Sequence, residues 1–213
     1  MSEMGWREQR KSGMAAIALS ALVGLALWFA LDRLLPPLAG MDDLSARMLV
    51  ALKCCAFAAL FCLFGGVEAV AHERLQSAAF DPLAGHETTR LRVNKQYLQN
   101  TLEQFVVFAV GLFGLAAYSE TGGAMRAVIA TTVVWILFRF AFWIGYHRSA
   151  AMRGMGAPGM AVALLMLLYV CARIGGDVAG DAGVIAVVGA FLALEAVLFR
   201  GTRGRPEAAG DTG

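Results

Sequence analysis

Six apolar stretches, each close to the length of a membrane-spanning helix, limit what this chain can fold into. They cover residues 13–35, 47–72, 97–118, 124–147, 158–176 and 182–200. A helix needs about 20 residues to cross the hydrocarbon core of a bilayer. Because backbone polar groups find no water there, such stretches are confined to hydrogen-bonded helices. We therefore predict an all-α fold, a polytopic membrane helical bundle in contact with the lipid bilayer.

The composition agrees with this class of protein. Of 213 residues, 59% are hydrophobic and only 16% are charged. The four cysteines lie inside apolar stretches, and neither they nor the three histidines have the spacing of metal ligands. We predict no metal site. No nucleic-acid surface is visible either, because the basic loops match anionic lipid at a membrane surface.

The basic residues are divided unequally between the two ends of the predicted helices. Twelve Lys and Arg residues fall in the N-terminal tail, the 73–96 and 147–157 loops and the C-terminal tail, and five fall on the opposite side. The positive-inside rule then places both termini in the cytoplasm. The first stretch lacks a convincing cleavage site, so we interpret it as an anchor helix rather than a signal peptide.

Polar residues recur at helical spacing in two of the stretches. Arg139, Tyr146 and Arg153 are seven residues apart, so they are expected to share one stripe if the segment is helical, and Gln96, Asn100 and Glu103 share a helix face at i, i+4 and i+7. The predicted orientation places Glu68, Asn100, Glu103 and Arg139 at a similar depth. We expect Glu103 and Arg139 to form a buried ion pair, since each relieves the other's desolvation cost. Helix-pairing contacts are the alternative interpretation of these polar groups.

These motifs resemble those of the MAPEG family, the membrane-associated proteins in eicosanoid and glutathione metabolism. The resemblance rests on Asn100-Thr-Leu-Glu103, which matches the family's Asn-x-x-Glu signature, and on Arg139, Tyr146 and Arg153 in order after it. It covers about residues 48–176, so the chain is similar to a bacterial-type member with one extra helix at each end. A bacterial inner membrane is the location that this implies.

The resemblance implies a trimeric helix bundle that binds glutathione between subunits near the cytosolic face. Glutathione would contact Asn100, Glu103, Arg139 and Tyr146, and Arg153 would assist formation of the thiolate. The implied activity is that of a glutathione-dependent membrane transferase or peroxidase acting on lipophilic electrophiles or hydroperoxides. Glutathione is the implied co-substrate, and the thiolate is the attacking form.

Three positions depart from the family pattern. Gln96 stands where many glutathione-using members have arginine, Phe142 where some have tyrosine, and Gly154 where the prostaglandin-forming branch has serine. They support an alternative, a non-catalytic membrane scaffold or lipid-binding protein of the same fold. A transporter or channel is disfavoured because the outer half of the predicted bundle is nearly all apolar.

The sequence predicts a simple domain organisation around the MAPEG-like core. The expected segments are a cytoplasmic tail (1–12), an additional helix (13–35), a four-helix domain (47–176), a second additional helix (182–200) and a disordered tail (201–213).

Overall fold

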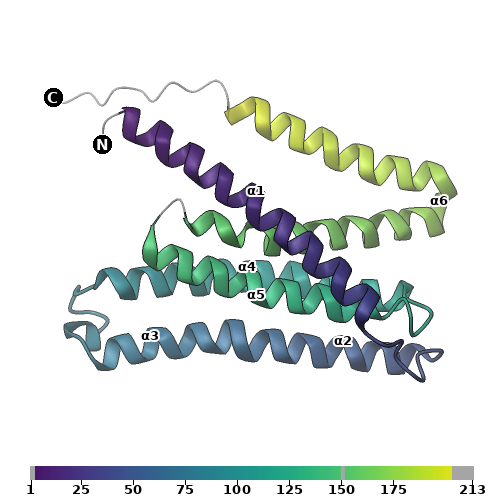
Figure 1. The fold of residues 1–213 in the computed structure, drawn as a ribbon, viewed down its shortest axis with the longest axis horizontal. Coiled ribbons are helices and arrows are strands. Elements are labelled where there is room, and N and C mark those ends of the chain that lie inside the picture. The colour runs from purple at the N-terminus through teal and green to yellow at the C-terminus, as the bar shows by residue number, and fades with distance from the viewer. Residues whose placement is uncertain (1–2, 150–151, 203–213) are drawn as a thin grey trace. The chain divides into compact units, whose positions relative to one another are not determined.

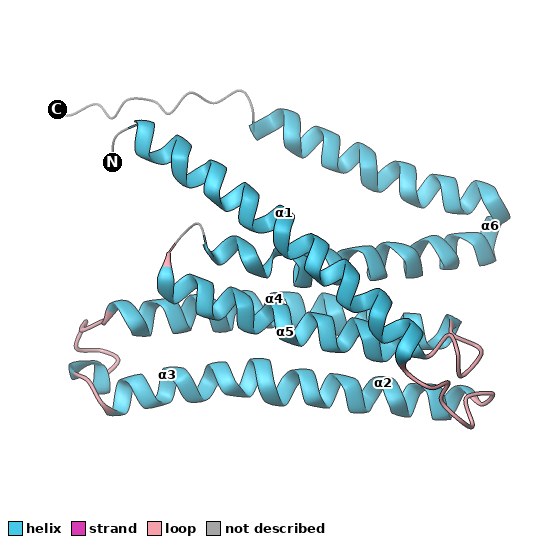
Figure 2. Ribbon diagram, viewed as in Figure 1, coloured by secondary structure: helices cyan, strands magenta, loops and turns pink. Residues whose placement is uncertain are grey.

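The computed structural model describes residues 3–149 and 152–202, and these consist of helices joined by short connections, with no strand among them (Figures 1 and 2). Five of the helices are long and apolar enough to cross a membrane. The prediction of an all-α membrane bundle is therefore confirmed. The chain divides into two compact units, Met1–Leu167 and Leu168–Gly213.

Nine helical elements follow one another along the described chain. They are α1 (Glu3–Leu34), α2 (Leu44–Ala58), the π-helix η1 (Ala59–Phe64), α3 (Gly65–Leu75), η2 (Ala78–Phe80), α4 (Thr89–Tyr118), α5 (Arg126–Arg148), η3 (Met152–Gly156) and α6 (Ala157–Thr202). The backbone stays helical at Ala59 and Gly65, where α2, η1 and α3 meet. These three elements therefore form one membrane-length helix over the predicted 47–72 stretch.

Two helices extend beyond the apolar stretches that predict them. α1 begins at Glu3, inside the predicted tail, and α4 begins at Thr89 rather than near residue 97. Thr88 caps α4, because its Oγ1 accepts a hydrogen bond from the backbone N–H of Leu91 at 3.0 Å. Hydropathy detects only the part of a helix that matches the hydrocarbon core, so polar turns beyond that core escape it.

The last two apolar stretches both lie in α6. Its backbone leaves the helical region at Ala179 and at Gly180, where φ is +58°. Glycine adopts that left-handed conformation without a steric penalty, so it allows a sharp turn between two helical halves. Beyond the turn the chain passes so close to itself that a Cβ on Gly183 would lie 1.9 Å from the carbonyl oxygen of Gly175.

Within the first unit, the core lies where α2, α4 and α5 meet. Phe108 and Trp135 stack there with ring centroids 4.5 Å apart, and both are fully buried. α1 is attached to α5 by a hydrogen bond of 3.0 Å from Trp28 Nε1 to Thr131 Oγ1. Gly24 permits close contact at that crossing, since a Cβ there would lie 2.9 Å from the Phe138 ring.

The connections of the first unit gather at two ends. The start of α1 and the α3–α4 connection lie at one end, and the α1–α2 and α4–α5 connections lie at the other (Figure 1). At the second end the backbone N–H of Leu38 donates to the Gly122 carbonyl at 3.1 Å, which joins the two connections. Successive long helices of the first unit therefore run in opposite directions, as the topology prediction assumes.

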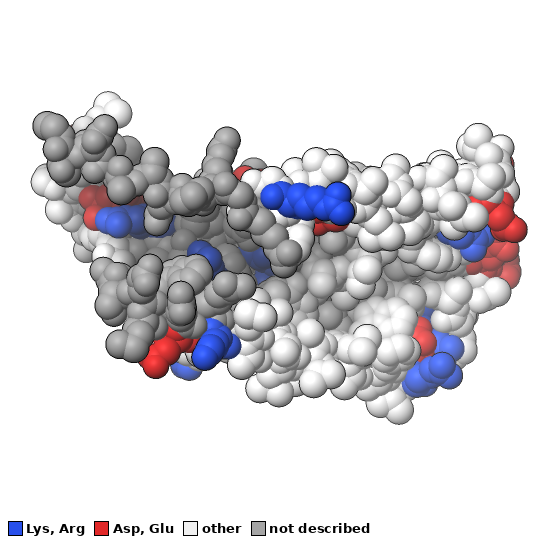
Figure 3. All heavy atoms as spheres, turned by 90° about the horizontal axis from the view of Figure 1, so that it is seen from above, with Lys and Arg blue, Asp and Glu red and all other residues white. Residues whose placement is uncertain are grey.

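Uncharged side chains make up most of the described surface in Figure 3. Large apolar residues are exposed on every long helix, among them Leu22, Phe57, Val106 and Ile144. Exposed apolar surface of this extent is unfavourable in water and favourable in lipid. The chain is an integral membrane protein.

Candidate functional site

Arg139 lies at the centre of the candidate site. α5 carries it in its second half, and its side chain is only 1% exposed. Nη1 donates to Gln104 Oε1 at 2.7 Å, and Nη2 donates to both Asn100 Oδ1 and Thr101 Oγ1 at 3.0 Å. We name Arg139 and its three acceptors on α4 the Arg139 layer. Because the acceptors are neutral, the charge of the guanidinium is solvated by the protein but not neutralised.

The expected ion pair between Glu103 and Arg139 is wrong for the single chain. Glu103 is exposed on α4 and accepts a hydrogen bond from Gln99 Nε2 at 3.3 Å. The residue that faces Arg139 is the next one, Gln104. Successive residues of a helix point about 100° apart, so a shift of one position moves a side chain to another face.

Asn100 connects the buried arginine with the exposed side of α4. Its Oδ1 accepts from Arg139 Nη2 and also from Gln104 Nε2 at 3.2 Å. With the oxygen held by two donors, the amide nitrogen is directed away from Arg139. Asn100 is half-buried and Glu103 is exposed one turn further along the same helix. This face therefore presents an amide donor and a carboxylate acceptor side by side.

A series of aromatic rings and cations runs from Arg139 to Arg153. The Arg139 guanidinium carbon lies 4.5 Å from the centroid of the Phe142 ring, which lies 5.6 Å from the Tyr146 ring. The guanidinium carbon of the exposed Arg153 lies 5.4 Å from the Tyr146 ring. Cation–π contacts of this kind hold a guanidinium over a ring face. The predicted helical stripe holds for Arg139 and Tyr146 but is wrong for Arg153, because α5 ends at Arg148 and Arg153 lies in η3. Contacts through Phe142 and Tyr146 connect the two arginines instead.

Other charged residues near this end have partners elsewhere. Glu68, expected at the depth of Arg139, lies 3.2 Å from His72 one turn along α3. Lys95 forms an ion pair of 2.8 Å with Glu87, which lies in the connection before α4. The hydrogen bond from Lys95 lowers the pKa of Glu87 below its ordinary value. Lys95 therefore does not replace the arginine that the family pattern has at Gln96.

Sequence reasoning missed a second group of polar and aromatic residues that supports Arg139. Tyr97 stacks on Trp143 with centroids 4.6 Å apart, and its hydroxyl donates to the Cys62 carbonyl of η1 at 3.2 Å. A π-helix disturbs the regular backbone ladder, which allows a carbonyl to accept a side-chain donor. The spacing of Asn94, Tyr97, Thr101 and Gln104 along one helix face was the available signal.

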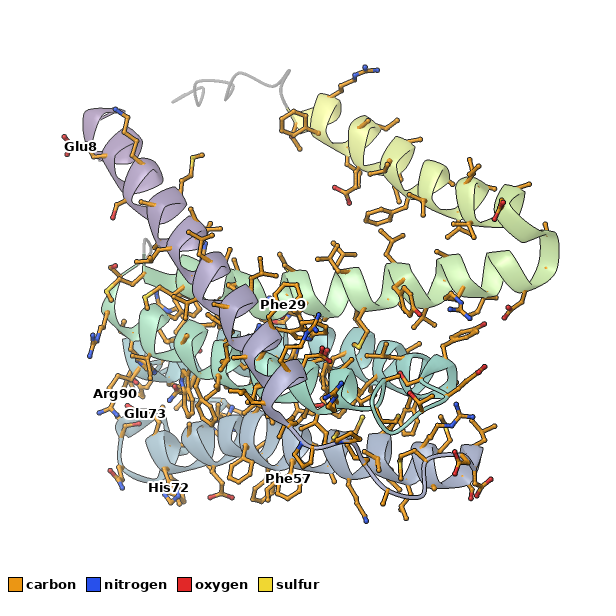
Figure 4. All side chains as sticks on the ribbon, turned by 45° about the vertical axis from the view of Figure 1, so that its right-hand side comes forward. Glu8, Phe29, Phe57, His72, Glu73 and Arg90 are labelled. Atoms are coloured by element: carbon orange, nitrogen blue, oxygen red, sulfur yellow. The ribbon has the colours of Figure 1, made fainter. Side chains whose placement is uncertain are left out.

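Asn94 organises a small polar cavity next to this group. It is buried, and its Oδ1 accepts from Trp143 Nε1 at 3.0 Å and lies 2.9 Å from His147 Nε2. The cavity, of about 180 Å³, lies between α3, α4 and α5. At its rim Arg90 Nε lies 3.5 Å from a carboxylate oxygen of Glu73, and Figure 4 shows the two side chains together.

The structure gives a packing reason for Gly154. A Cβ at this position would lie 2.9 Å from Ile17 and 3.1 Å from the backbone oxygen of Gly13, both in α1. The additional N-terminal helix thus passes directly over the residue that follows Arg153. A side chain at position 154 would require Ile17 or α1 to shift, so glycine allows this close approach.

A comparison with protein families identifies the family of this chain. The sequence model of the MAPEG family matches residues 51–175, which is more than half of the chain. The match includes every residue of the Arg139 layer and also Glu103, Tyr146 and Arg153. No curated protein and no solved structure matches the chain. The helical membrane architecture and the family match together show that this chain belongs to the MAPEG family.

Proposed function

We propose that the Arg139 layer and the adjoining face of α4 bind glutathione. On this proposal the protein is a glutathione-dependent membrane transferase or peroxidase that acts on lipophilic electrophiles or hydroperoxides. The observation that carries it is a buried guanidinium with no carboxylate partner among the described residues, held by three neutral side chains. An unneutralised cation in a medium of low dielectric constant favours an anionic ligand nearby.

Glutathione has the charges that this face can receive. Its two carboxylates suit the amide nitrogen of Asn100, the field of Arg139 and the hydroxyl of Tyr146, and its ammonium suits Glu103. Arg139 acts mainly through its neighbours in this proposal, because its own side chain is enclosed. It fixes the orientation of Asn100, and its positive charge attracts the carboxylates of the ligand without direct contact.

Arg153 is the proposed catalytic residue. It lies at the exposed end of the aromatic series, where its guanidinium can approach the glutathione sulfur. A cation next to a thiol stabilises the thiolate, which is the nucleophile. The thiolate then forms a carbon–sulfur bond with an electrophile that arrives from the bilayer, and the electrophile's leaving group departs with the bonding electrons.

A homotrimer in a bacterial inner membrane, with both termini in the cytoplasm, is part of the same proposal. The family resemblance implies the trimer, and the exposed apolar residues Leu102, Val106 and Val110 on α4 offer a surface for a second copy. Light scattering of the detergent-solubilised protein, with the detergent mass subtracted, should give the mass of three chains. A single-chain mass would contradict the trimer.

The proposed catalysis is tested by spectroscopic titration of the thiolate of bound glutathione. We expect the wild type to lower the pKa of the bound thiol below the free value of about 8.5. Arg153→Ala should return it toward that value, whereas the control Arg148→Ala, at a nearby exposed arginine, should not. An unshifted thiol in the wild type, or the same shift in Arg153→Ala, would contradict the catalytic role.

A non-catalytic scaffold or lipid-binding protein is the second candidate function. The observation that favours it is the enclosure of Arg139, whose two terminal nitrogens donate to Gln104, Asn100 and Thr101 without a ligand, although its Nε has no partner. Calorimetric titration separates the two candidates. Glutathione binding with turnover of a lipophilic electrophile supports the enzyme, and no detectable binding supports the scaffold.

A further inference from the structure

A second cavity, separate from the Arg139 layer, opens on the side of the bundle between the α2–η1 segment and α5. Its volume is about 530 Å³, and its exposed walls are entirely apolar. Val50, Phe57 and Phe61 form one wall, and Ile129, Val133 and Leu137 form the other. Thr132 also borders it, but its hydroxyl donates to the Val128 carbonyl at 2.8 Å. These side chains offer shape and apolar contact only, and Lys53, which also borders the cavity, lines it with its hydrocarbon stem rather than its ammonium.

The cavity is an elongated groove along the two helices. From Val50 to Phe61 the wall rises about 16 Å, and from Ile129 to Leu137 about 12 Å, at 1.5 Å per residue. Phe57 and Phe61 stack nearly parallel with centroids 6.2 Å apart, so they present a continuous aromatic surface. Both rings are about half exposed, and Figure 4 marks Phe57 on this helix. A single extended hydrocarbon chain matches these dimensions.

Lys53 is the one charged residue in the lining of this groove. The helix from Leu44 to Leu75 has 32 residues and is about 48 Å long, so it projects about 9 Å beyond a 30 Å hydrocarbon core at each end if it is centred. Lys53, nine residues from Leu44, then lies about 4–5 Å inside the core boundary. From there its flexible stem reaches the headgroup region. No described carboxylate forms an ion pair with it.

We propose that this groove binds one long-chain fatty acid, with the acyl chain between α2–η1 and α5 and the carboxylate on Lys53. The groove holds one chain, whereas a membrane phospholipid has two. The single ammonium matches a single carboxylate, and the other polar side chains of the lining, Thr132 and Cys54, are neutral, so no second cation is present for a phosphate group. This lipid site shares no residue with the Arg139 layer, so it does not depend on glutathione binding.

The proposal is tested with the full-length protein in nanodiscs and a palmitic acid that carries a photoreactive diazirine near the end of its chain. We expect crosslinks on the peptides that contain Phe57, Phe61 or Leu137. Unlabelled palmitate should compete for the site, and its methyl ester should compete about tenfold less well, since it lacks the charge-assisted hydrogen bond to Lys53.

Three variants assign this preference to Lys53. Lys53→Gln should remove the difference between palmitate and its ester, and Lys53→Arg should keep it. The matched control Lys95→Gln, at an exposed lysine on α4 that pairs with Glu87, should also keep it. Val133→Trp should fill the groove and abolish the crosslinks; its helix content, measured by circular dichroism, checks that it still folds.

Four results would overturn the proposal, and each is readable on the wild-type protein. They are equal competition by acid and ester, crosslinks spread evenly over the outer helix faces, equal labelling by a diazirine-bearing phospholipid, and no crosslink on the groove peptides. The last result is the one expected if the groove is a contact between subunits instead of a lipid site.

Discussion

Two buried arginines contact α4 at different heights, and they are held in different ways. Arg47 in α2 is 8% exposed and Arg139 in α5 is 1% exposed. Arg47 Nη1 donates to the backbone carbonyl of Ala117 in the last turn of α4 at 3.0 Å, whereas Arg139 donates to three side chains. Unpaired carbonyls occur at the end of every helix, so any suitable cation can satisfy them.

The two buried arginines therefore differ in what their hydrogen bonds require of α4. Arg47 needs only the end of a helix, but Arg139 needs Asn100, Thr101 and Gln104 at the correct positions on one helix. Neither arginine forms an ion pair with a described carboxylate, so the difference lies in the matched side chains that Arg139 requires, and this is why we propose a ligand site at Arg139 and not at Arg47. The predictions below test this difference, from the largest expected effect to the smallest.

Arg139→Met should have the largest effect. It removes the donor of three side-chain acceptors, so we expect a loss of about 2–3 kcal/mol in the free energy of unfolding. Glutathione binding should weaken strongly as well, because Asn100 loses the contact that orients it. Equilibrium unfolding in mixed micelles and calorimetric titration measure the two effects. Full retention of glutathione affinity would remove the Arg139 layer from the site.

Arg47→Met is the matched control at the other buried arginine. One hydrogen bond to a backbone carbonyl is lost, so we expect a loss of about 1 kcal/mol in the free energy of unfolding. Glutathione affinity should stay at the wild-type value under the same conditions. If Arg47→Met weakened binding as much as Arg139→Met does, the effect would reflect general destabilisation, and the contrast between the two arginines would be lost.

A double-mutant cycle measures the contact between Arg139 and Gln104. Arg139→Met, Gln104→Leu and the double variant should show a coupling of about 1 kcal/mol in unfolding, because the two side chains share a hydrogen bond of 2.7 Å. A cycle between Arg47 and Gln104 should show additive losses. Additivity in the Arg139 cycle would mean that the 2.7 Å contact contributes no net stability.

The sequence alone was sufficient for the fold class, for a physical reason. A bilayer requires long apolar helices, so hydropathy identifies them directly. It does not detect the polar first turns of α4, which need no apolar side chains, or the π-helix at Ala59–Phe64, whose residues are those of an ordinary membrane helix. Local composition does not specify the hydrogen-bond register within a helix.

The sequence indicated at which level along the helices the polar residues of the candidate site lie, but not which face of α4 meets Arg139. The spacing of Asn100, Glu103 and Arg139 predicted a polar layer, and the structure joins Asn100 and Arg139 by a hydrogen bond of 3.0 Å. Charge complementarity selected Glu103 as the partner of Arg139. The structure places Gln104 there instead, because the buried face of α4 is the one with Tyr97 and Thr101. An intramembrane arginine can be satisfied by neutral acceptors, so charge alone does not identify its partner.

Glu103→Gln tests whether Glu103 lies on the exposed face of α4, and it should have the smallest effect on stability. Glu103 is exposed, and its described partner is Gln99, one turn away on the same helix. We expect a change of less than about 0.5 kcal/mol in the free energy of unfolding, as for other surface substitutions.

The effect of Glu103→Gln on the ligand should be much larger than its effect on the fold. If Glu103 receives the ammonium of glutathione, the substitution removes a charge-assisted hydrogen bond and weakens binding about tenfold. Glu68→Gln, at the half-buried carboxylate of α3 that pairs with His72, is the control and should leave binding unchanged. A destabilisation equal to that of Arg139→Met would instead identify Glu103 as the counterion of a buried arginine in the assembled protein. Reduced affinity with unchanged stability would place the ligand on the exposed face of α4, with Arg139 acting from behind it.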